Sequence, residues 1–303
     1  MSNPQKPNVA ITGLYQVGKS TLINCLMADT LAEVGNGLPT SHSISRFTIG
    51  APERAVLRDR NRRVADMPLD AYRKMLVNKE PIPRNTDAEF VVNRDCLANI
   101  NLWDTPGLDS TGKNEAADTT LATKAIEDAD FLIVVVPNEQ LKETTFTTIK
   151  AQIKTKPCAI VMNCKDSDPE SDPNRDARQA IASQLKVAGL QPVEIQMGQP
   201  VLACNLVWYW LSVTSPNPAV SKDDKSIVGI LEEHRRNMRH YYSRRPPEPS
   251  VEELRRKSHL EPLRDFLLGD GWSFRTIPTI SALDKAFHDW QHDLFATFDS
   301  NKK

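Results

Sequence analysis

A glycine-rich stretch near the N-terminus has residue types that could bind phosphate. Residues 9–12 (VAIT) favour a strand, residues 13–20 read GLYQVGKS, and apolar residues then recur at helical spacing. Glycines let the backbone curl so that successive N–H groups point at phosphate oxygens, while the following helix presents its positive end. Lys19 is then expected to reach the β- and γ-phosphates, and the Ser20 hydroxyl to bind Mg²⁺. This order of strand, loop and helix predicts a nucleotide-binding loop.

Two later segments carry side chains that could complete a magnesium and phosphate site. Thr40 lies in a polar, glycine-rich segment at residues 33–43, where its hydroxyl or that of a neighbouring serine could complete the Mg²⁺ shell and sense the γ-phosphate. Asp104 begins the run DTPG after an apolar stretch and could hold Mg²⁺ through a water molecule. The backbone N–H of Gly107, at the end of that run, could bond to the γ-phosphate.

A fourth segment could select the base. Residues 163–166 (NCKD) follow the apolar run CAIVM. The Asp166 carboxylate could accept hydrogen bonds from the ring N–H and the exocyclic amine of guanine, a pair that adenine does not offer. Asn163 would brace this loop against the phosphate loop. A backbone contact to the guanine oxygen could come from Ala203, Cys204 or Asn205, after the last predicted strand.

This ordered set resembles the translation-factor-related class of GTPases over roughly residues 9–205, on the motifs GLYQVGKS, WDTPG and NCKD. The charged insertion before WDTPG, the loop GNGLPT and the pattern SxLxxLxxFL at residues 258–267 are most similar to dynamin-like and HSR1-related (Era-like) GTPases. The resemblance implies an α/β three-layer sandwich, with helices on both faces of a mostly parallel central sheet. It also implies that the chain binds GTP and GDP with Mg²⁺ and hydrolyses GTP slowly.

The resemblance and the motifs together give a set of expected site residues. Those expected to contact nucleotide are Gly13, Tyr15, Gln16, Val17, Gly18, Lys19, Ser20, Thr21, Asp104, Gly107, Asn163, Lys165, Asp166, Ala203, Cys204 and Asn205. Those expected to act in hydrolysis are Gln16, Lys19, Thr40 and Gly107. The expected magnesium ligands are Ser20, Thr40 and Asp104.

Three positions depart from the family pattern. Cys164 replaces a lysine whose stem usually packs against the base and the phosphate loop, so guanine affinity is expected to be lower; a plain substitution is favoured over redox control. Leu108 stands where Ras-like proteins place a water-orienting glutamine. Gln16 occupies the loop position at which some relatives coordinate a monovalent cation with Asn or Ser. A cation at Gln16, or a homodimer formed across the nucleotide face, could assist hydrolysis.

Alternating strand and helix patterns are expected to position these residues. The predicted strands are 9–12, 44–49 as an edge strand, 89–93 and 96–103 as a hairpin-like pair, 131–136, 158–163 and 200–204. The predicted helices are 69–77, 119–129, 141–154, 173–188, 206–213, 227–242, 254–268 and 279–298. The GTPase domain is expected to span residues 1–270, with insertions at 51–88 and 206–257, and residues 271–303 to form a helical extension.

Composition excludes several other classes. The net charge of −1 gives no overall attraction to nucleic acid or to anionic membranes. Five cysteines without CxxC spacing indicate reduced thiols in the cytoplasm and not a zinc site or a disulfide framework. The longest apolar run, residues 131–136, is too short to span a bilayer. Association with a membrane surface stays open.

The sequence leaves open several alternatives for the function of the chain and for the roles of its basic and aromatic segments. The chain could be an interaction module that binds GTP and hardly hydrolyses it. Two basic segments could contact lipid headgroups or RNA, although solvated faces or internal ion pairs are favoured: Arg54, Arg58, Arg60, Arg62 and Arg63, and the run at residues 234–245. The aromatic run at residues 208–210 is expected in the core and not in a partner interface. The apolar stripe of the tail is expected to pack on its own domain or on a second subunit.

Overall fold

The computed structural model describes residues 6–14, 16–29, 31–32, 44–59, 62–77, 86–107, 115–153, 156–165, 167–214 and 250–269. Residues Met1–Gly269 belong to one compact unit, and Asp270–Lys303 are assigned to a second, which lies outside the described residues. The domain limits given above stay a prediction. The helices predicted at 227–242 and 279–298 also fall outside the described residues.

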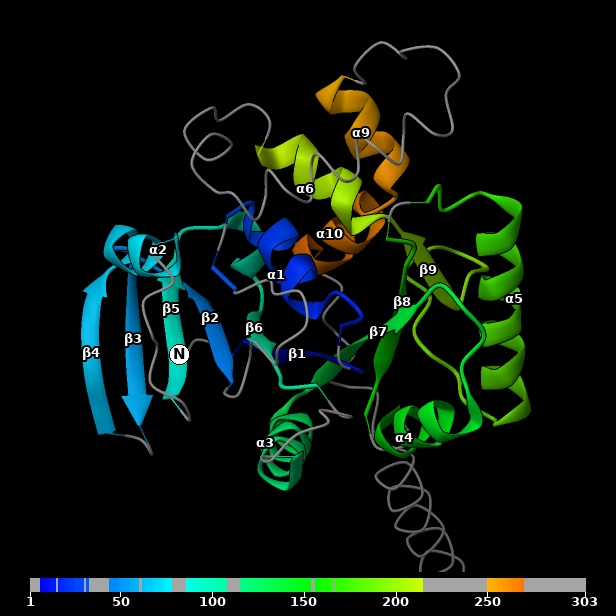
Figure 1. The fold of residues 1–303 in the computed structure, drawn as a ribbon, viewed down its shortest axis with the longest axis horizontal. Coiled ribbons are helices and arrows are strands. Elements are labelled where there is room, and N and C mark those ends of the chain that lie inside the picture. The colour runs from blue at the N-terminus through cyan, green and yellow to red at the C-terminus, as the bar shows by residue number, and fades with distance from the viewer. Residues whose placement is uncertain are drawn as a thin grey trace, which may run out of the picture. The chain divides into compact units, whose positions relative to one another are not determined.

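The described residues form one nine-stranded sheet in the order β4-β3-β5-β2-β6-β1-β7-β8-β9 (Figure 1). Its strands are β1 (Asn8–Gly13), β2 (Ser45–Ile49), β3 (Arg54–Asp59), β4 (Arg62–Pro68), β5 (Thr86–Val92), β6 (Asn101–Asp104), β7 (Phe131–Pro137), β8 (Cys158–Asn163) and β9 (Val201–Cys204). The run β6-β1-β7-β8-β9 is parallel throughout. Its central strands are rich in Val, Ile and Leu, because both faces of a parallel sheet are buried. The predicted α/β class is confirmed.

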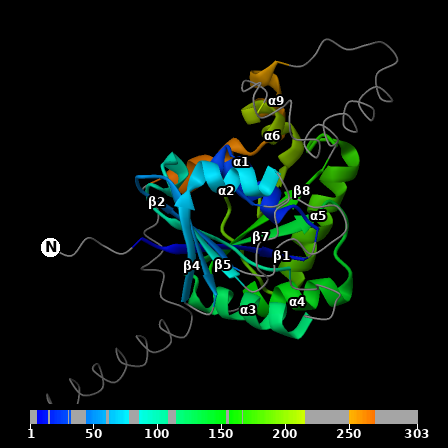
Figure 2. The same cartoon turned by 60° about the vertical axis from the view of Figure 1, so that its left-hand side comes forward.

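Helices cover both faces of this sheet (Figure 2). They are α1 (Lys19–Met27), α2 (Leu69–Val77), α3 (Glu115–Asp128), α4 (Glu143–Ile153), α5 (Asp172–Val187), α6 (Leu206–Thr214), α9 (Val251–Ser258) and α10 (Glu261–Leu268). Alternate residues of β7 face opposite layers: Leu132 and Val134 join the buried cluster that contains residues of α3, α4 and α5. Phe131 packs instead against Phe266 of α10, with ring centroids 5.6 Å apart.

Helix α6 confirms the predicted location of the aromatic run in the core. Trp208, Tyr209 and Trp210 expose only 6%, 1% and 8% of their surface. None of the helices in the described part of the chain has the length and apolar character needed to cross a bilayer.

The predicted charged insertion at residues 51–88 is mostly regular structure. It contains the helix predicted at 69–77 (α2) and an antiparallel hairpin, β3–β4, that the sequence did not indicate. Phe90 of β5 stacks on Phe47 of β2 (4.8 Å) and meets the edge of Tyr72 of α2 (4.9 Å). These three rings form an apolar layer between the insertion helix and the sheet, so the insertion extends the sheet and its core.

Two predicted strand arrangements are wrong. Residues 44–49 were expected at an edge, but β2 lies between β5 and β6, parallel to the first and antiparallel to the second. The segments 89–93 and 96–103 were expected to pair as a hairpin. They contribute to β5 and β6, which β2 separates, and a 3₁₀ turn, η1 (Asp95–Leu97), lies between them. Strand neighbours depend on tertiary packing, which alternation of residue types does not encode.

The helix predicted at 254–268 is two helices, α9 and α10. His259 has a left-handed backbone (φ 57°) at the C-terminus of α9, and α10 begins with Glu261 and Pro262. Proline has no backbone N–H to continue a helix but fits its first turn, so it starts α10 and ends the predicted single run.

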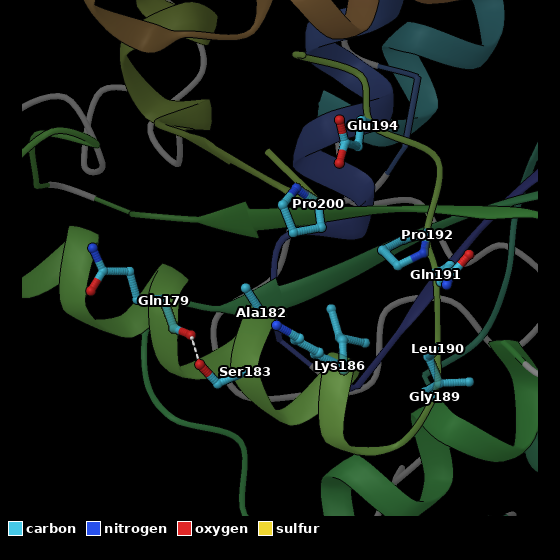
Figure 3. Close-up of a pocket in the computed structure, with 11 residues that line it drawn as sticks. Gln179, Ala182, Ser183, Lys186, Gly189, Leu190, Gln191, Pro192, Glu194 and Pro200 are labelled. Carbon is cyan, nitrogen blue, oxygen red and sulfur yellow. Dashed lines mark hydrogen bonds between the residues drawn. The ribbon is translucent and has the colours of Figure 1, made fainter. Parts of the chain in front are cut away.

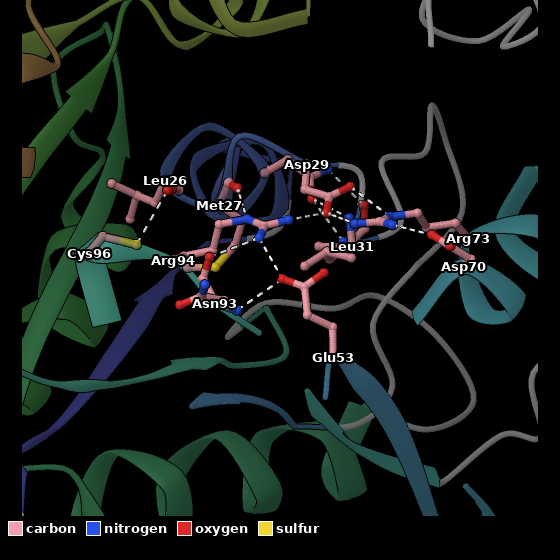
Figure 4. Close-up of polar contacts among 12 residues, drawn as sticks. Leu26, Met27, Asp29, Leu31, Glu53, Asp70, Arg73, Asn93, Arg94 and Cys96 are labelled. Atoms are coloured by element: carbon pink, nitrogen blue, oxygen red, sulfur yellow. Dashed lines mark hydrogen bonds and ion pairs between the residues drawn. The ribbon is translucent and has the colours of Figure 1, made fainter. Parts of the chain in front are cut away.

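Partly buried charges join the insertion to the C-terminal end of α1 (Figure 4). Asp29 follows α1, and its carboxylate accepts hydrogen bonds from Arg94 (2.8 Å) and Arg73. Arg94 also donates to Glu53 (2.6 Å) and to the Met27 carbonyl (2.8 Å), one of the last carbonyls of α1. A cation at a helix C-terminus is favoured by the helix dipole. The network therefore fixes the insertion to the helix that carries the phosphate loop.

Arg94→Ala is expected to lower the free energy of unfolding by ~2–3 kcal/mol, because it removes one donor from each of two partly buried carboxylates, Asp29 and Glu53, and from the Met27 carbonyl. Urea denaturation measures this change. The control is Arg58→Ala, which removes a single ion pair with Glu89 (2.9 Å) and should cost much less. Equal losses in the two variants would contradict the role of Arg94 as the joint between α1 and the insertion.

Candidate functional site

The phosphate loop depends on two glycines for its shape. Gly13 has φ 144° and Gly18 has φ 101°, values that L side chains rarely adopt. A Cβ at Gly13 would lie 2.3 Å from the Val135 carbonyl oxygen, and one at Gly18 would lie 2.5 Å from Asn163 Nδ2. The loop therefore turns tightly against the ends of β7 and β8. Gln16 also has a left-handed backbone (φ 58°), and Tyr15 lies outside the described residues.

Lys19 opens α1 and is 7% exposed. Its ammonium Nζ donates to the carbonyl oxygens of Gly13 (3.2 Å) and Leu14 (2.6 Å). The loop backbone thus wraps around a buried positive charge at the positive end of a helix. This arrangement suits phosphate, which would be neutralised by the ammonium and by loop N–H groups.

Ser20 and Asp104 meet beside the lysine. The Ser20 hydroxyl donates to Asp104 Oδ2 (3.3 Å), and the Asp104 carboxylate is 2% exposed. Its second oxygen, Oδ1, is buried without a hydrogen-bond partner among the described residues. A buried carboxylate oxygen that lacks a partner is costly unless a cation or water satisfies it. The donor set is all oxygen, which suits Mg²⁺, and Ser20 and Asp104 would hold it.

Burial raises the pKa of Asp104 to about 6, even though the Lys19 ammonium and the Ser20 hydroxyl favour its charged form. Mg²⁺ needs the charged carboxylate, so a proton competes with the metal below this pKa. Mg²⁺ affinity of the nucleotide complex should therefore fall about tenfold per pH unit below pH 6.

The measurement is a Mg²⁺ titration of the GDP complex at pH 7.5, 6 and 5, with Asp104→Asn as the control. Titration of the nucleotide phosphate affects both proteins equally, so the wild-type chain should show the steeper pH dependence. Equal slopes would show that Asp104 does not bind the metal.

The DTPG segment is tied to β1. Thr105 donates to the Ile11 carbonyl through its hydroxyl (2.8 Å) and its backbone N–H (3.3 Å). Gly107 is buried at the last described position before residues 108–114. Thr40 and Leu108 lie outside the described residues, so their predicted roles stay predictions.

The predicted brace between the base loop and the phosphate loop is present. Asn163 Nδ2 donates to the Val17 carbonyl (3.0 Å), while its Oδ1 accepts from the backbone N–H of Lys165 (3.1 Å). Lys165 has a left-handed backbone (φ 51°) and an exposed side chain. Asp166 lies outside the described residues, and its contact with guanine stays a prediction.

Cys164 is a core residue. It is fully buried in the apolar cluster that includes Met162 of β8 and Ala177 of α5. Burial raises the pKa of its thiol to about 12. The side chain is therefore neither a lysine-like support for the base nor a reactive thiol, as expected for a plain substitution. All five cysteines are buried and free, in agreement with the prediction of reduced thiols.

The segment after β9 is used within the protein. The Cys204 carbonyl accepts from the Cys164 N–H (2.8 Å), and the Asn205 N–H donates to the Ser258 carbonyl (2.8 Å). The Asn205 N–H is thus engaged, and a backbone contact to guanine stays a prediction for Ala203 and Cys204. Thr21 is half-buried on the first turn of α1.

Sequence reasoning missed Ser167 and Asn174, whose side chains bond to each other beside the base loop (2.8 Å). Asn174 is only 2% exposed. Polar residues near a helix start are usually read as caps or exposed positions, so composition carried no signal for this pair. The position of Asn174, in the first turn of the helix predicted after NCKD, was the only feature of the sequence that could have indicated this role.

A groove of about 710 Å³ lies elsewhere, between the C-terminal half of α5 and the loop before β9 (Figure 3). Its lining includes Lys186, Gly189, Leu190 and Glu194. None of its lining residues is a predicted site residue, so the groove is separate from the phosphate loop.

Residues 8–164 match the model of the family described as 50S ribosome-binding GTPase. No curated protein matches the chain in sequence. Among solved structures, a chain of an oligomerised bacterial dynamin pair, described as sensing and tethering membranes, is similar with 14% identity and a TM-score of 0.48, over 76% of this chain and 34% of that one.

Two Era structures are also similar. Aquifex aeolicus Era bound to GDP and AlF₄⁻ has 16% identity and a TM-score of 0.40, over 82% of this chain and 60% of that one. Era in complex with MgGDPNP and a segment of 16S ribosomal RNA has 17% identity and a TM-score of 0.39, over 80% and 59%. The chain thus spans less than two thirds of the length of these structures.

Proposed function

Because the chain belongs to the family of 50S ribosome-binding GTPases, we propose that it binds GTP with Mg²⁺ and hydrolyses it slowly to GDP and phosphate. One observation carries the proposal: Ser20 and Asp104 meet beside a buried lysine in a loop built on two glycines. Gain and loss of the γ-phosphate would make the chain a nucleotide-dependent conformational switch.

The chain's own residues would act mainly by position and charge. Lys19 would neutralise the β- and γ-phosphates, and the N–H groups of Gly18 and Gly107 would bond to phosphate oxygens. Ser20, Asp104 and Thr40 would hold Mg²⁺. When bound, Mg²⁺ neutralises charge on the phosphate oxygens.

Hydrolysis also needs a positioned water, and Leu108 offers no polar group for it. The water must therefore be positioned by a group other than the glutamine that Ras-like proteins use. Gln16 could hold a monovalent cation, or a second copy of the chain could complete the site across the nucleotide face. Equal rates of GTP hydrolysis in potassium and in a large organic cation would exclude a role for a monovalent cation.

We place the chain in the cytoplasm, with guanine nucleotide as its ligand. A cytoplasmic location agrees with five buried, free cysteines. Contact with RNA or with a membrane surface is not favoured, since Arg58 and Arg46 are paired internally with Glu89 and Asp87.

Single-turnover hydrolysis of GTP by the purified chain, over a hundredfold range of protein concentration, tests the proposal. A slow rate at every concentration supports an intrinsic GTPase, and a rate that rises with concentration supports assistance by a second copy. Size measurement with GDP and with a GTP analogue identifies the assembly. If the chain binds GTP but does not hydrolyse it at any concentration, the proposed GTPase activity is wrong and the interaction module is favoured.

A further inference from the structure

A partly buried polar cluster, which we call the loop brace, holds the chain directly after the NCKD motif. It consists of Asn138, Ser167, Asn174 and Asn205, which come from the end of β7, the base loop, α5 and the start of α6. Ser167 is its centre. The Ser167 hydroxyl and backbone N–H both donate to the Cys164 carbonyl (2.7 and 3.0 Å), which ties Ser167 to the end of the NCKD strand.

Asn174 holds Ser167 from α5. Its Nδ2 donates to Ser167 Oγ (2.8 Å) and to the Asp168 carbonyl (2.7 Å). Its Oδ1 accepts from Asn138 Nδ2 (3.0 Å). The amide is therefore bonded on both sides, although the residue is 2% exposed.

Asn205 holds Ser167 from the start of α6 and has two separable functions. Its Nδ2 donates to the Ser167 carbonyl (2.9 Å), while its Oδ1 accepts from the Trp208 N–H (2.9 Å) at the start of α6. Its backbone N–H donates to the Ser258 carbonyl at the end of α9. The side chain is thus both a helix cap and a support for the base loop.

The amides of Asn174 and Asn205 are buried and hydrogen-bonded through both nitrogen and oxygen. A buried amide costs free energy unless it is hydrogen-bonded, and a fully bonded network specifies one arrangement of the backbone. Asn163 anchors the loop before position 166, and the loop brace anchors it after that position. The described residues before and after position 166, where the base-selecting carboxylate is predicted, are therefore both held by hydrogen bonds.

We propose that Asn174 and Asn205 are positioning residues that set the preference for guanine over hypoxanthine, by fixing Ser167 and so the orientation of the Asp166 carboxylate. This inference rests on the proposed function. Guanine carries an exocyclic amine that hypoxanthine lacks, so a well-oriented carboxylate favours GDP over IDP. Loss of orientation should reduce that preference without removing the phosphate contacts.

The test uses Asn205→Asp, because aspartate keeps the oxygen that caps α6 but cannot donate to the Ser167 carbonyl. Equilibrium binding of GDP and of IDP is measured for each protein. In Asn205→Asp the ratio of the IDP to the GDP dissociation constant should fall by about five- to tenfold. The control Ser212→Ala loses a buried hydrogen bond within α6 (to the Tyr209 carbonyl, 2.7 Å) and should keep the wild-type ratio.

Asn174→Ala is the second variant and should lower the ratio in the same direction, so the test holds if one variant fails to fold. A thermal melt reports folding. If wild-type protein binds neither GDP nor IDP, the proposed function fails. If it binds GDP preferentially and the ratio stays unchanged in the folded variants, the loop brace is only structural and the inference is overturned.

Discussion

Replacing Lys19 with alanine is expected to lower the rate of GTP hydrolysis by about 100- to 1,000-fold and to weaken GTP binding. The ammonium is the one buried positive charge that the described residues place inside the phosphate loop. It would act on the γ-phosphate together with Mg²⁺ and the loop N–H groups, and no other charged side chain of the described loop could replace it. Quench-flow or end-point assays of phosphate release measure the effect.

Two controls separate chemistry from folding in the Lys19 variant. Lys186→Ala removes an exposed lysine from α5 and should leave hydrolysis unchanged. A thermal melt is needed because Lys19 also bonds to two loop carbonyls, so its loss should lower stability. Unchanged hydrolysis in a folded Lys19→Ala protein would show that this loop does not carry the reaction.

Asp166→Asn is expected to exchange guanine for xanthine specificity. The asparagine amide can donate to the additional carbonyl of xanthine, whereas the carboxylate only accepts. GTP affinity should fall by about 100-fold, because one guanine donor then faces the amide NH₂ group and the other bonds to a neutral oxygen in place of a charged one. Competition of GTP, XTP and ATP for the same site measures the exchange.

The matched control for this exchange is Asp168→Asn, two residues further along the loop. The Asp168 carbonyl accepts a hydrogen bond from Asn174, and its Oδ1 accepts one from the Glu170 N–H. The Asp168→Asn substitution should leave base preference unchanged. Unchanged GTP affinity in Asp166→Asn would show that the base is recognised elsewhere.

The central sheet was predictable because its signal is local. Strands such as β7 (FLIVVVP) and β8 (CAIVMN) are mostly apolar runs that contain β-branched residues, and each is followed by polar residues. Helix α2 begins directly after Pro68 and was predicted at its observed limits. The phosphate loop was predictable for the same reason, since its glycines, lysine and serine are adjacent in sequence.

Features that depend on distant contacts could not be predicted. The strands of the β3–β4 hairpin (RAVLRD and RRVADMP) mix charged and apolar residues without a regular alternation, so their strand pattern was hidden. β2 is internal because β5 pairs with it in parallel, an arrangement in which Phe90 stacks on Phe47. The loop brace joins side chains from four separate elements, so no spacing in the sequence indicated that Ser167 and Asn174 support the base loop.

Equilibrium titration of the purified chain with GDP and with ADP, each with Mg²⁺, tests the central claim most directly. The account predicts saturable one-to-one binding of GDP, and ADP binding at least about 100-fold weaker, because adenine cannot donate the hydrogen-bond pair that a carboxylate at position 166 would accept. Equal affinities for the two nucleotides, or no binding of either, would contradict it.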